Sequence, residues 1–246
     1  MKLILLRHGQ SEWNLENRFT GWHDIGLTPH GVFEAELAGN LLIKNDISIN
    51  TITTSTLKRA TNTAKLVAEK IKYNEKRISY QWRLNERHYG ALQGLNKSET
   101  AKKYGEEQVL IWRRSYDIPP PLMDENDKRH PRFEKKYEKI KNLVPSGESL
   151  KDVITRMQPF LDKFIYDFSK GSGNHLIVAH SNSLRAIVKI IDKLSEEEII
   201  SINIPTGIPL VYEFEDNFEI FNKKYLIDEK ELNIKLEEIA NQGKIK

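Results

Sequence analysis

The chain has 246 residues, which is enough for one large α/β domain or two small ones, and we favour one. Hydrophobic residues make up 39% and charged residues 30%, a balance typical of a soluble globular protein, and no stretch approaches the roughly 20 apolar residues of a membrane span, so a disordered or membrane protein is excluded. The net charge of +3 is too small to favour nucleic acid as a partner, and the absence of cysteine excludes disulfides and thiolate metal sites and fits a cytoplasmic protein.

The first nine residues predict a buried strand that ends at a candidate site. Residues 2–6 are a short apolar run, which stops abruptly at Arg7, His8 and Gly9. The second half of the chain repeats this pattern, because the apolar run 176–179 leads directly into His180. Ligands of open α/β sheets bind beyond the carboxyl ends of the strands. We therefore predict that the two histidines face each other.

A polar and aromatic loop is predicted at 10–27, where Asn, Gly and Trp are too frequent for regular structure. Thr28 and Pro29 then indicate the N-cap and the first turn of a helix that reaches about Lys44. The apolar residues of this helix recur at helical spacing, so one of its faces should pack against a sheet.

A second strand is predicted at 49–54, where β-branched residues dominate. It leads into Ser55 and a helix to about Lys72, with Arg59 in the first turn. The order strand, helix, strand predicts an α/β fold in three layers, with a mostly parallel central sheet flanked by helices.

The pattern changes after a possible strand at 77–82. Residues 85–146 carry little strand signal, although two short helices are predicted at 97–104 and 106–114. The stretch 117–136 that follows is rich in proline and charge. A loop of this length is usually a functional lid or a disordered segment.

The clearest helix is predicted at 151–168, where apolar residues recur at helical spacing and Pro159 should introduce a kink. The runs 210–214 and 218–225 predict a hairpin. The tail from 228 onward predicts an amphipathic helix and then an unstructured basic end. The apolar residues on one face of that helix are Leu232, Leu236, Ile239 and Ala240.

Neither His8 nor His180 has a second histidine at metal-ligand spacing, so no metal site is predicted. A neutral imidazole attacks phosphorus well, and a guanidinium group can bind two phosphate oxygens at once. The available guanidinium groups are those of Arg7, Arg59, Arg113 and Arg114. A single arginine or histidine is usually an ordinary surface or core residue, and only the joint pattern favours phosphate chemistry.

Seven segments carry longer motifs: LLRHGQSEWN (5–14), RFTGW (18–22), LKRA (57–60), LNERHYGALQGLNKSETAKKYGEEQV (84–109), WRRSYD (112–117), NSLRA (182–186) and IPTGIPLVYEF (204–214). Together they closely resemble the 2,3-bisphosphoglycerate-dependent phosphoglycerate mutases of the histidine phosphatase superfamily. The resemblance covers the chain from residue 1 to 244, and the long segments are specific to the mutase branch.

The resemblance implies that 2,3-bisphosphoglycerate phosphorylates His8, which then passes the phosphoryl group to a substrate hydroxyl. This chemistry interconverts 3-phosphoglycerate and 2-phosphoglycerate without a metal. The resemblance also makes Glu86 the proton donor and acceptor, and it makes His180, Arg7 and Arg59 the groups that stabilise the transferring phosphoryl. A carboxyl that exchanges protons near neutral pH needs shielding from water, so we predict that Glu86 is partly dehydrated.

The substrate-binding residues implied by the resemblance are Ser11, Asn14, Thr20, Gly21, Arg87, His88, Tyr89, Lys97, Arg113, Arg114, Ser181 and Asn182. One position departs from the family, which usually has glycine where this chain has Ser181. A side chain there would crowd the phosphate if the backbone had to approach it, whereas with a negative φ serine costs little and adds a hydroxyl donor. We expect retained activity.

Three alternatives remain. In a histidine phosphatase, water takes the phosphoryl group from His8; the segment 86–114 argues against this, because it looks like a mutase cover that excludes water, although weak phosphatase side activity is expected. A bisphosphoglycerate synthase is less favoured because Ser11 looks like the mutase form. An inactive phosphosugar-binding module is disfavoured by the intact His8, Glu86 and His180.

The resemblance implies a single domain over 1–246, with an active-site cover inserted at about 85–146 and a C-terminal tail at 228–246. As a further hypothesis, this tail closes over the site. The expected partners are small-molecule phosphoglycerates, without nucleic acid or membrane, and we expect a homo-oligomer, with a dimer favoured.

Overall fold

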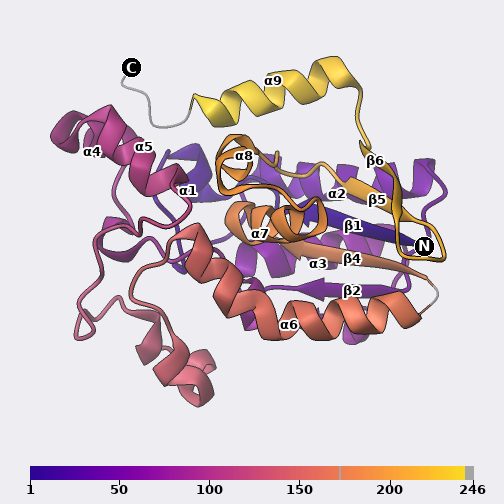
Figure 1. The fold of residues 1–246 in the computed structure, drawn as a ribbon, viewed down its shortest axis with the longest axis horizontal. Coiled ribbons are helices and arrows are strands. Elements are labelled where there is room, and N and C mark those ends of the chain that lie inside the picture. Colours follow the sequence, from indigo (N-terminus) through magenta and orange to yellow (C-terminus); the bar gives the residue numbers. More distant parts are fainter. Residues whose placement is uncertain (172, 242–246) are drawn as a thin grey trace.

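The computed structural model describes residues 1–171 and 173–241, and in this part of the chain six strands form one central sheet (Figure 1). The strands are β1 (Lys2–Arg7), β2 (Thr51–Thr54), β3 (Ser79–Tyr80), β4 (Asn174–Ala179), β5 (Leu210–Phe214) and β6 (Ile220–Tyr225). Their order is β3-β2-β4-β1-β5-β6. The first four run parallel, and β5 and β6 pair antiparallel. The predicted mostly parallel sheet is confirmed.

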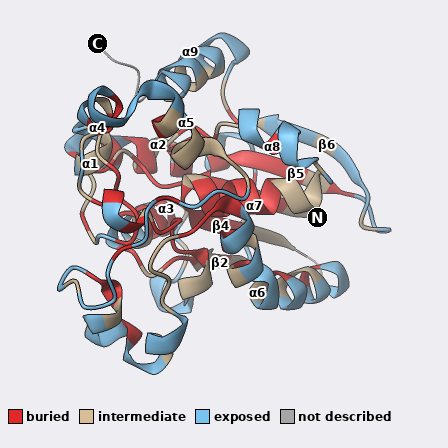
Figure 2. Ribbon diagram, turned by 60° about the vertical axis from the view of Figure 1, so that its left-hand side comes forward, coloured by how far each residue is buried: buried red, intermediate tan, exposed pale blue. Residues whose placement is uncertain are grey.

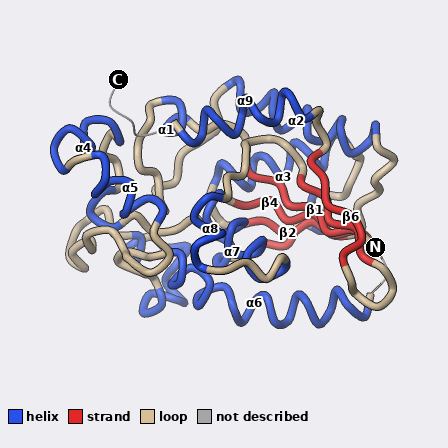
Figure 3. Tube along the Cα trace, turned by 45° about the horizontal axis from the view of Figure 1, so that its top comes forward, coloured by secondary structure: helices blue, strands red, loops and turns tan. Residues whose placement is uncertain are grey.

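Helices cover both faces of the sheet, because alternate strand residues point to opposite sides. Leu3 and Leu5 of β1 belong to one apolar cluster with residues of α6 (Leu150–Lys170) and α7 (Ser181–Ile191). Ile4 and Leu6 belong to a second cluster with residues of α2 (Pro29–Lys44) and α3 (Lys58–Lys70). Figures 1 and 3 show the resulting three layers, and Figure 2 shows that the buried residues concentrate in the sheet and α7.

Local signals in the sequence set the helix boundaries well. Thr28 caps α2 by accepting a hydrogen bond from the Gly31 N–H (3.0 Å), and Pro29 occupies the first turn. Arg59 lies in the first turn of α3, as predicted. α6 continues through Pro159, and its axis changes direction along its length (Figure 1).

Two predictions for short elements were wrong. The loop predicted at 10–27 contains a helical turn, α1 (Glu12–Leu15), which forms because Ser11 and Asn14 cap each other reciprocally. The strand predicted at 77–82 is only β3, since short 3₁₀ turns at Glu75–Arg77 and Trp82–Leu84 interrupt it on both sides.

The segment between β3 and α6 forms no further strand within the described residues and lies at one end of the sheet (Figure 1). Its helices α4 (Lys97–Tyr104) and α5 (Glu106–Arg114) match the predicted bounds. Two 3₁₀ stretches, Pro131–Phe133 and Lys135–Leu143, follow them. This segment therefore adds to the carboxyl end of the sheet and not to its faces.

The C-terminal elements are α8 (Glu196–Ser201), the β5–β6 hairpin and α9 (Glu229–Ala240). α9 lies along one side of the molecule, above α2 and α8 in the view of Figure 1. None of its residues is buried; Leu232, Leu236 and Ile239 are half-buried, whereas Ala240 is exposed, contrary to the predicted apolar face. The basic end predicted after this helix lies outside the described residues.

Candidate active site

The two histidines leave the sheet side by side. β1 and β4 are neighbouring parallel strands, and their register pairs Arg7 with Ala179. The next residue of each strand is therefore a histidine at the same level, and the His8 N–H donates to the Ala179 carbonyl (3.0 Å). The ring centroids of His8 and His180 are 4.9 Å apart with an interplanar angle of 61°. The predicted pairing is confirmed.

His8 is held as a neutral imidazole. Its Nδ1 lies 2.7 Å from the Gly9 carbonyl oxygen, which can only accept, so the ring hydrogen is on Nδ1 and Nε2 carries the lone pair. Burial, followed by the positive charges of Arg59 and Arg7, lowers the pKa of His8 well below its ordinary value. The imidazole is therefore unprotonated at neutral pH, as attack on phosphorus requires.

The His180 ring is fully buried beside that of His8 and is held by Ser55. Its Nε2 lies 2.7 Å from Ser55 Oγ, which also accepts the Leu57 N–H (3.2 Å). His180 Nδ1 has no hydrogen-bond partner within the described chain.

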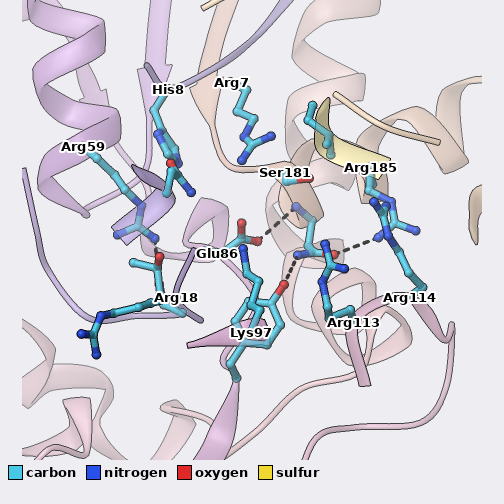
Figure 4. A pocket seen from close by; sticks show the side chains of 16 residues that line it. Arg7, His8, Arg18, Arg59, Glu86, Lys97, Arg113, Arg114, Ser181 and Arg185 are labelled. Carbon is cyan, nitrogen blue, oxygen red and sulfur yellow. Dashed lines mark hydrogen bonds between the residues drawn. The ribbon is translucent and has the colours of Figure 1, made fainter. Parts of the chain in front are cut away.

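A pocket opens beside His8, and many of the residues that line it are cationic (Figure 4). Its lining residues are Arg7, His8, Asn14, Arg18, Thr20, Gly21, Arg59, Glu86, Tyr89, Lys97, Arg113, Arg114, Ser181, Asn182, Arg185 and Ile239. Among the described residues, seven cationic side chains and one carboxyl group therefore meet here. Such an excess of positive charge suits a ligand with several negative charges.

Backbone carbonyls hold the arginines of this pocket in place. Arg59 donates to the carbonyls of His23 (3.0 Å) and Gly21 (2.7 Å), and Arg7 donates to that of Ile204 (2.8 Å). Burial lowers the pKa of Arg59 to about 10, so the group stays charged at neutral pH. The Nε atoms of Arg7 and Arg185 are buried donors without a partner in the described chain. These free donors fit an anionic ligand.

The cations that come from the insertion are also desolvated. Burial, followed by the charges of Arg113, Arg7 and Arg114, lowers the pKa of Lys97 well below its ordinary value. Burial and the neighbouring Arg114 lower the pKa of Arg113 to about 10. A bound anion would relieve this mutual repulsion, so the arrangement favours occupancy by a polyanion.

Glu86 is shielded from water, as predicted, with 8% of its surface exposed. Its Oε1 accepts the N–H groups of Arg87 (2.8 Å) and Asn182 (3.1 Å). Asn182 lies in the first turn of α7, where helix N–H groups lack partners within the helix. The Asn182 side chain donates to the Tyr89 hydroxyl (3.3 Å), so hydrogen bonds join Glu86, Asn182 and Tyr89 on one wall of the pocket.

Most of the predicted site residues line this pocket. His180 is fully buried beside His8 and is not among the lining residues, and Ser11, Arg87 and His88 lie behind the wall. Ser11 is buried and bonds the Asn14 side chain, which it orients (Oγ to Oδ1, 2.9 Å). Arg87 donates to the Trp112 and Arg113 carbonyls, which ties α5 to the Glu86 segment. The His88 ring lies 5.8 Å from that of His130. These three residues support the site and do not contact its interior.

Sequence reasoning missed three residues that line the pocket: Arg18, Arg185 and Ile239. Arg185 could have been found, because it lies one helical turn after Asn182 and donates to its Oδ1 (2.9 Å). Arg18 lies within a motif that the sequence singled out, and its Nη1 donates to the Gly94 carbonyl (2.9 Å). Ile239 is brought in by the packing of α9, which local sequence does not specify.

Ser181 lines the pocket as the first residue of α7, and it is not among the residues with positive φ. The serine side chain therefore adds no backbone strain, and the residue is half-buried at the wall.

Within the described residues, no group of three or more His, Asp or Glu side chains is placed to hold a metal ion. No helix in this part of the chain is long and apolar enough to cross a membrane.

Comparisons with known proteins agree with this geometry. The model of the histidine phosphatase superfamily (branch 1) matches residues 3–142 and 122–223. The chain is 51% identical to a 2,3-bisphosphoglycerate-dependent phosphoglycerate mutase of Treponema denticola, covering 100% of both chains. It is 49% identical to one from Lachnoclostridium phytofermentans, covering 100% of this chain and 99% of the relative.

Solved structures with the same fold include a mycobacterial glucosyl-3-phosphoglycerate phosphatase in complex with VO3. That structure has a TM-score of 0.69 and 22% identity, and the alignment covers 92% of this chain and 98% of the other. An α-ribazole phosphatase from Shigella flexneri has a TM-score of 0.65 and 20% identity, with coverage of 90% and 95%. At these identities the likeness concerns the fold alone.

Proposed function

This chain belongs to the histidine phosphatase superfamily, and we propose that within it the chain is a glycolytic phosphoglycerate mutase of the 2,3-bisphosphoglycerate-dependent type. It interconverts 3-phosphoglycerate and 2-phosphoglycerate and is therefore an isomerase of the intramolecular phosphotransferase type. The observation that carries the proposal is the free Nε2 of His8 beside the ring of His180, at the base of a pocket with seven cationic side chains among the described residues. Relatives that are about half identical over their full length support the same reaction.

When bound, 2,3-bisphosphoglycerate supplies the phosphoryl group that primes the enzyme. His8 Nε2 accepts this group while the phosphorus–oxygen bond to the donor breaks, and His8 later yields it to the hydroxyl of the bound phosphoglycerate. Glu86 takes the proton of the attacking hydroxyl and returns a proton to the departing oxygen. Arg7, Arg59 and His180 stabilise the charge on the phosphoryl oxygens.

The remaining cations hold the rest of the ligand. Bisphosphoglycerate carries two phosphates of about −1.5 to −2 each, together with a carboxylate. We assign Lys97, Arg113 and Arg114, which all come from the insertion, to the end of the ligand that does not react. The other proposed binding residues are Asn14, Thr20, Gly21, Tyr89, Ser181 and Asn182.

The insertion favours a mutase over a phosphatase. Its cations hold the end of a phosphoglycerate that does not react, so the ligand hydroxyl is kept near phospho-His8 and water is displaced. We therefore propose one domain in which residues 85–146 form the active-site cover and 228–246 form a closing tail. We further propose that the enzyme works in the cytoplasm as a homo-oligomer, with a dimer favoured.

An assay of mutase activity with and without 2,3-bisphosphoglycerate, and with a metal chelator, tests this function. We expect strong dependence on bisphosphoglycerate and no response to the chelator. Intact-mass analysis after exposure to bisphosphoglycerate should show one acid-labile phosphoryl group, which His8→Asn abolishes. Activity that is independent of bisphosphoglycerate but lost with the chelator would contradict the proposal.

A further inference from the structure

Glu86 lies on a segment without helix or strand, between the 3₁₀ turns Trp82–Leu84 and Gly90–Leu92. A carboxyl group that transfers protons must be held close to its productive position, because small displacements cost much of the rate. The two contacts of Glu86 Oε1 are to backbone N–H groups. The position of the carboxyl therefore depends on what fixes the backbone around it.

A buried arginine on α6 fixes the carbonyl groups of this segment. Arg156 Nη1 donates to the Arg83 carbonyl (2.6 Å), and its Nη2 lies within hydrogen-bond distance of the carbonyls of Asn85 (3.1 Å) and Glu86 (3.3 Å). Trp22 adds a second donor to the Glu86 carbonyl from its Nε1 (2.5 Å). The guanidinium fork suits this task, because its donors diverge within one plane.

Glu148 binds both Arg156 and the backbone that follows Glu86 in the chain. Its carboxylate accepts two hydrogen bonds from Arg156, from Nε (2.6 Å) and from Nη2 (3.1 Å). Its Oε2 also accepts the His88 N–H (2.8 Å), and its own N–H donates to the His88 carbonyl (2.9 Å). Along the chain, Arg156 therefore fixes the backbone before and at Glu86, and Glu148 fixes it two residues later, at His88.

The pair is almost completely enclosed, with 7% of the Arg156 side chain and 3% of the Glu148 side chain exposed. A buried ion pair is often no more stabilising than apolar side chains of the same volume, since both charges lose their hydration. What apolar side chains cannot supply is the set of hydrogen bonds to the carbonyls of Arg83, Asn85 and Glu86 and to the His88 N–H. The pair therefore contributes chiefly by fixing the position of the backbone around Glu86.

We infer that Arg156 and Glu148 are positioning residues that hold Glu86 where it exchanges a proton with the substrate hydroxyl. They contact neither the pocket nor the reacting atoms and act through the Glu86 backbone. This inference rests on the proposed mutase function. It predicts that loss of the fork lowers kcat while KM for 3-phosphoglycerate stays nearly constant, because the binding cations are untouched.

The test is a double-mutant cycle between Arg156→Lys and Glu86→Gln, measured as mutase kcat at saturating bisphosphoglycerate. Lysine keeps the charge but cannot reach all four partners, so Arg156→Lys alone should lower kcat by about 100-fold, the loss typical of a displacement near 1 Å. In the Glu86→Gln background, the same substitution should have almost no further effect. The control is Arg132→Lys, which alters an arginine of the insertion whose partner is the exposed Glu125 and should leave kcat unchanged.

The outcomes separate the two proposals. If the wild-type chain shows no bisphosphoglycerate-dependent mutase activity, the proposed function fails. If the wild type is active but the losses from the two substitutions are additive, or KM rises in place of a fall in kcat, the positioning role is overturned. Should Arg156→Lys not fold, Glu148→Gln is measured in the same cycle, since it keeps an oxygen for the His88 N–H. Failure of both variants to fold would assign the pair to the fold and overturn the inference.

Discussion

At the scale of single residues, the two histidines are held by different partners. His8 uses its Nδ1–H to bond Gly9 and presents the bare Nε2 to the pocket. The His180 ring is fully buried beside it and is held at Nε2 by Ser55. The ring that we propose as the acceptor of the phosphoryl group therefore lines the pocket, and the other ring does not.

The Ser55 hydroxyl should be needed to hold His180 beside His8. In Ser55→Ala, the His180 ring loses its hydrogen bond at Nε2 and with it a fixed position next to the transferring phosphoryl group. We expect kcat to fall by about 10- to 100-fold, somewhat less than the usual loss when a donor to a reacting oxygen is deleted. The matched control is Thr54→Val, which removes a neighbouring buried hydroxyl that bonds only the Val178 carbonyl. It should lower stability but retain kcat, and equal losses in the two variants would contradict the assignment.

The charge of Arg59 should set the acid limit of the reaction. Because Arg59 is the first charge that opposes protonation of His8, Arg59→Met removes a cause that lowers the pKa of the imidazole. The acid limb of kcat/KM, which reports groups of the free enzyme, should then move to higher pH. Arg18→Met also removes a cation from the pocket, but Arg18 is not a cause of the His8 shift, so it should weaken binding without moving the limb. An unmoved limb in Arg59→Met would contradict this account.

At the scale of elements, sequence patterns located what local physics determines. The start of α4 follows from the Asn96 side chain that caps it, and the histidines follow from apolar strands that end abruptly. The strand predicted at 77–82 was too long. Ser79 and Tyr80 of the edge strand β3 are both exposed, so the sequence shows no alternation of buried and exposed residues that would mark the ends of the strand. Ile239 reaches the pocket only through the packing of α9 against the body of the protein, and no local pattern encodes that contact.

α9 contributes a side chain to the pocket and is tied to the residues beside it. Its Ile239 lines the pocket, and the amine of its Lys235 lies 3.6 Å from the buried carboxylate of Glu34. Glu34 in turn accepts the Gln10 N–H (2.7 Å) and the Thr206 hydroxyl (2.8 Å), which links the tail to the loop that follows β1 and His8.

A chain that ends after Asp228 should therefore hydrolyse phospho-His8 faster relative to mutase turnover, since water gains access. The ratio of phosphatase to mutase rates, measured on the same preparation, should rise severalfold. Lys235→Met should change this ratio in the same direction, whereas Lys230→Ala at an exposed position of the same helix should not. An unchanged ratio in the truncated chain would rule out the closing role.

At the scale of the whole molecule, buried neutral histidines make stability depend on pH. Burial is the main cause that lowers the pKa of His8 and His180, and it lowers that of His88 to about 3. In the unfolded chain these groups titrate near 6.5, so below that pH the unfolded state binds protons that the folded state does not. The stabilisation is therefore complete above about pH 6.5 and is lost as the pH falls.

Urea denaturation at pH 7.5, 6.0 and 5.0 should show the free energy of unfolding falling below pH 6.5. Each buried histidine should contribute about 1.4 kcal/mol per pH unit to the slope. His88→Leu should reduce the slope by about one proton, whatever it does to stability at neutral pH. A slope that does not differ between the wild type and this variant would contradict the assignment.

The position of β1 in the sheet has a consequence for biosynthesis. Its two neighbours, β4 and β5, begin at Asn174 and Leu210. During translation β1 is therefore synthesised long before the strands with which it pairs. At roughly 5–20 residues per second, this delay is about ten to forty seconds. Nascent chains arrested before β5 should accordingly be cleaved within β1 by a protease that leaves the released protein intact, and the enzyme gains its activity only at the end of translation.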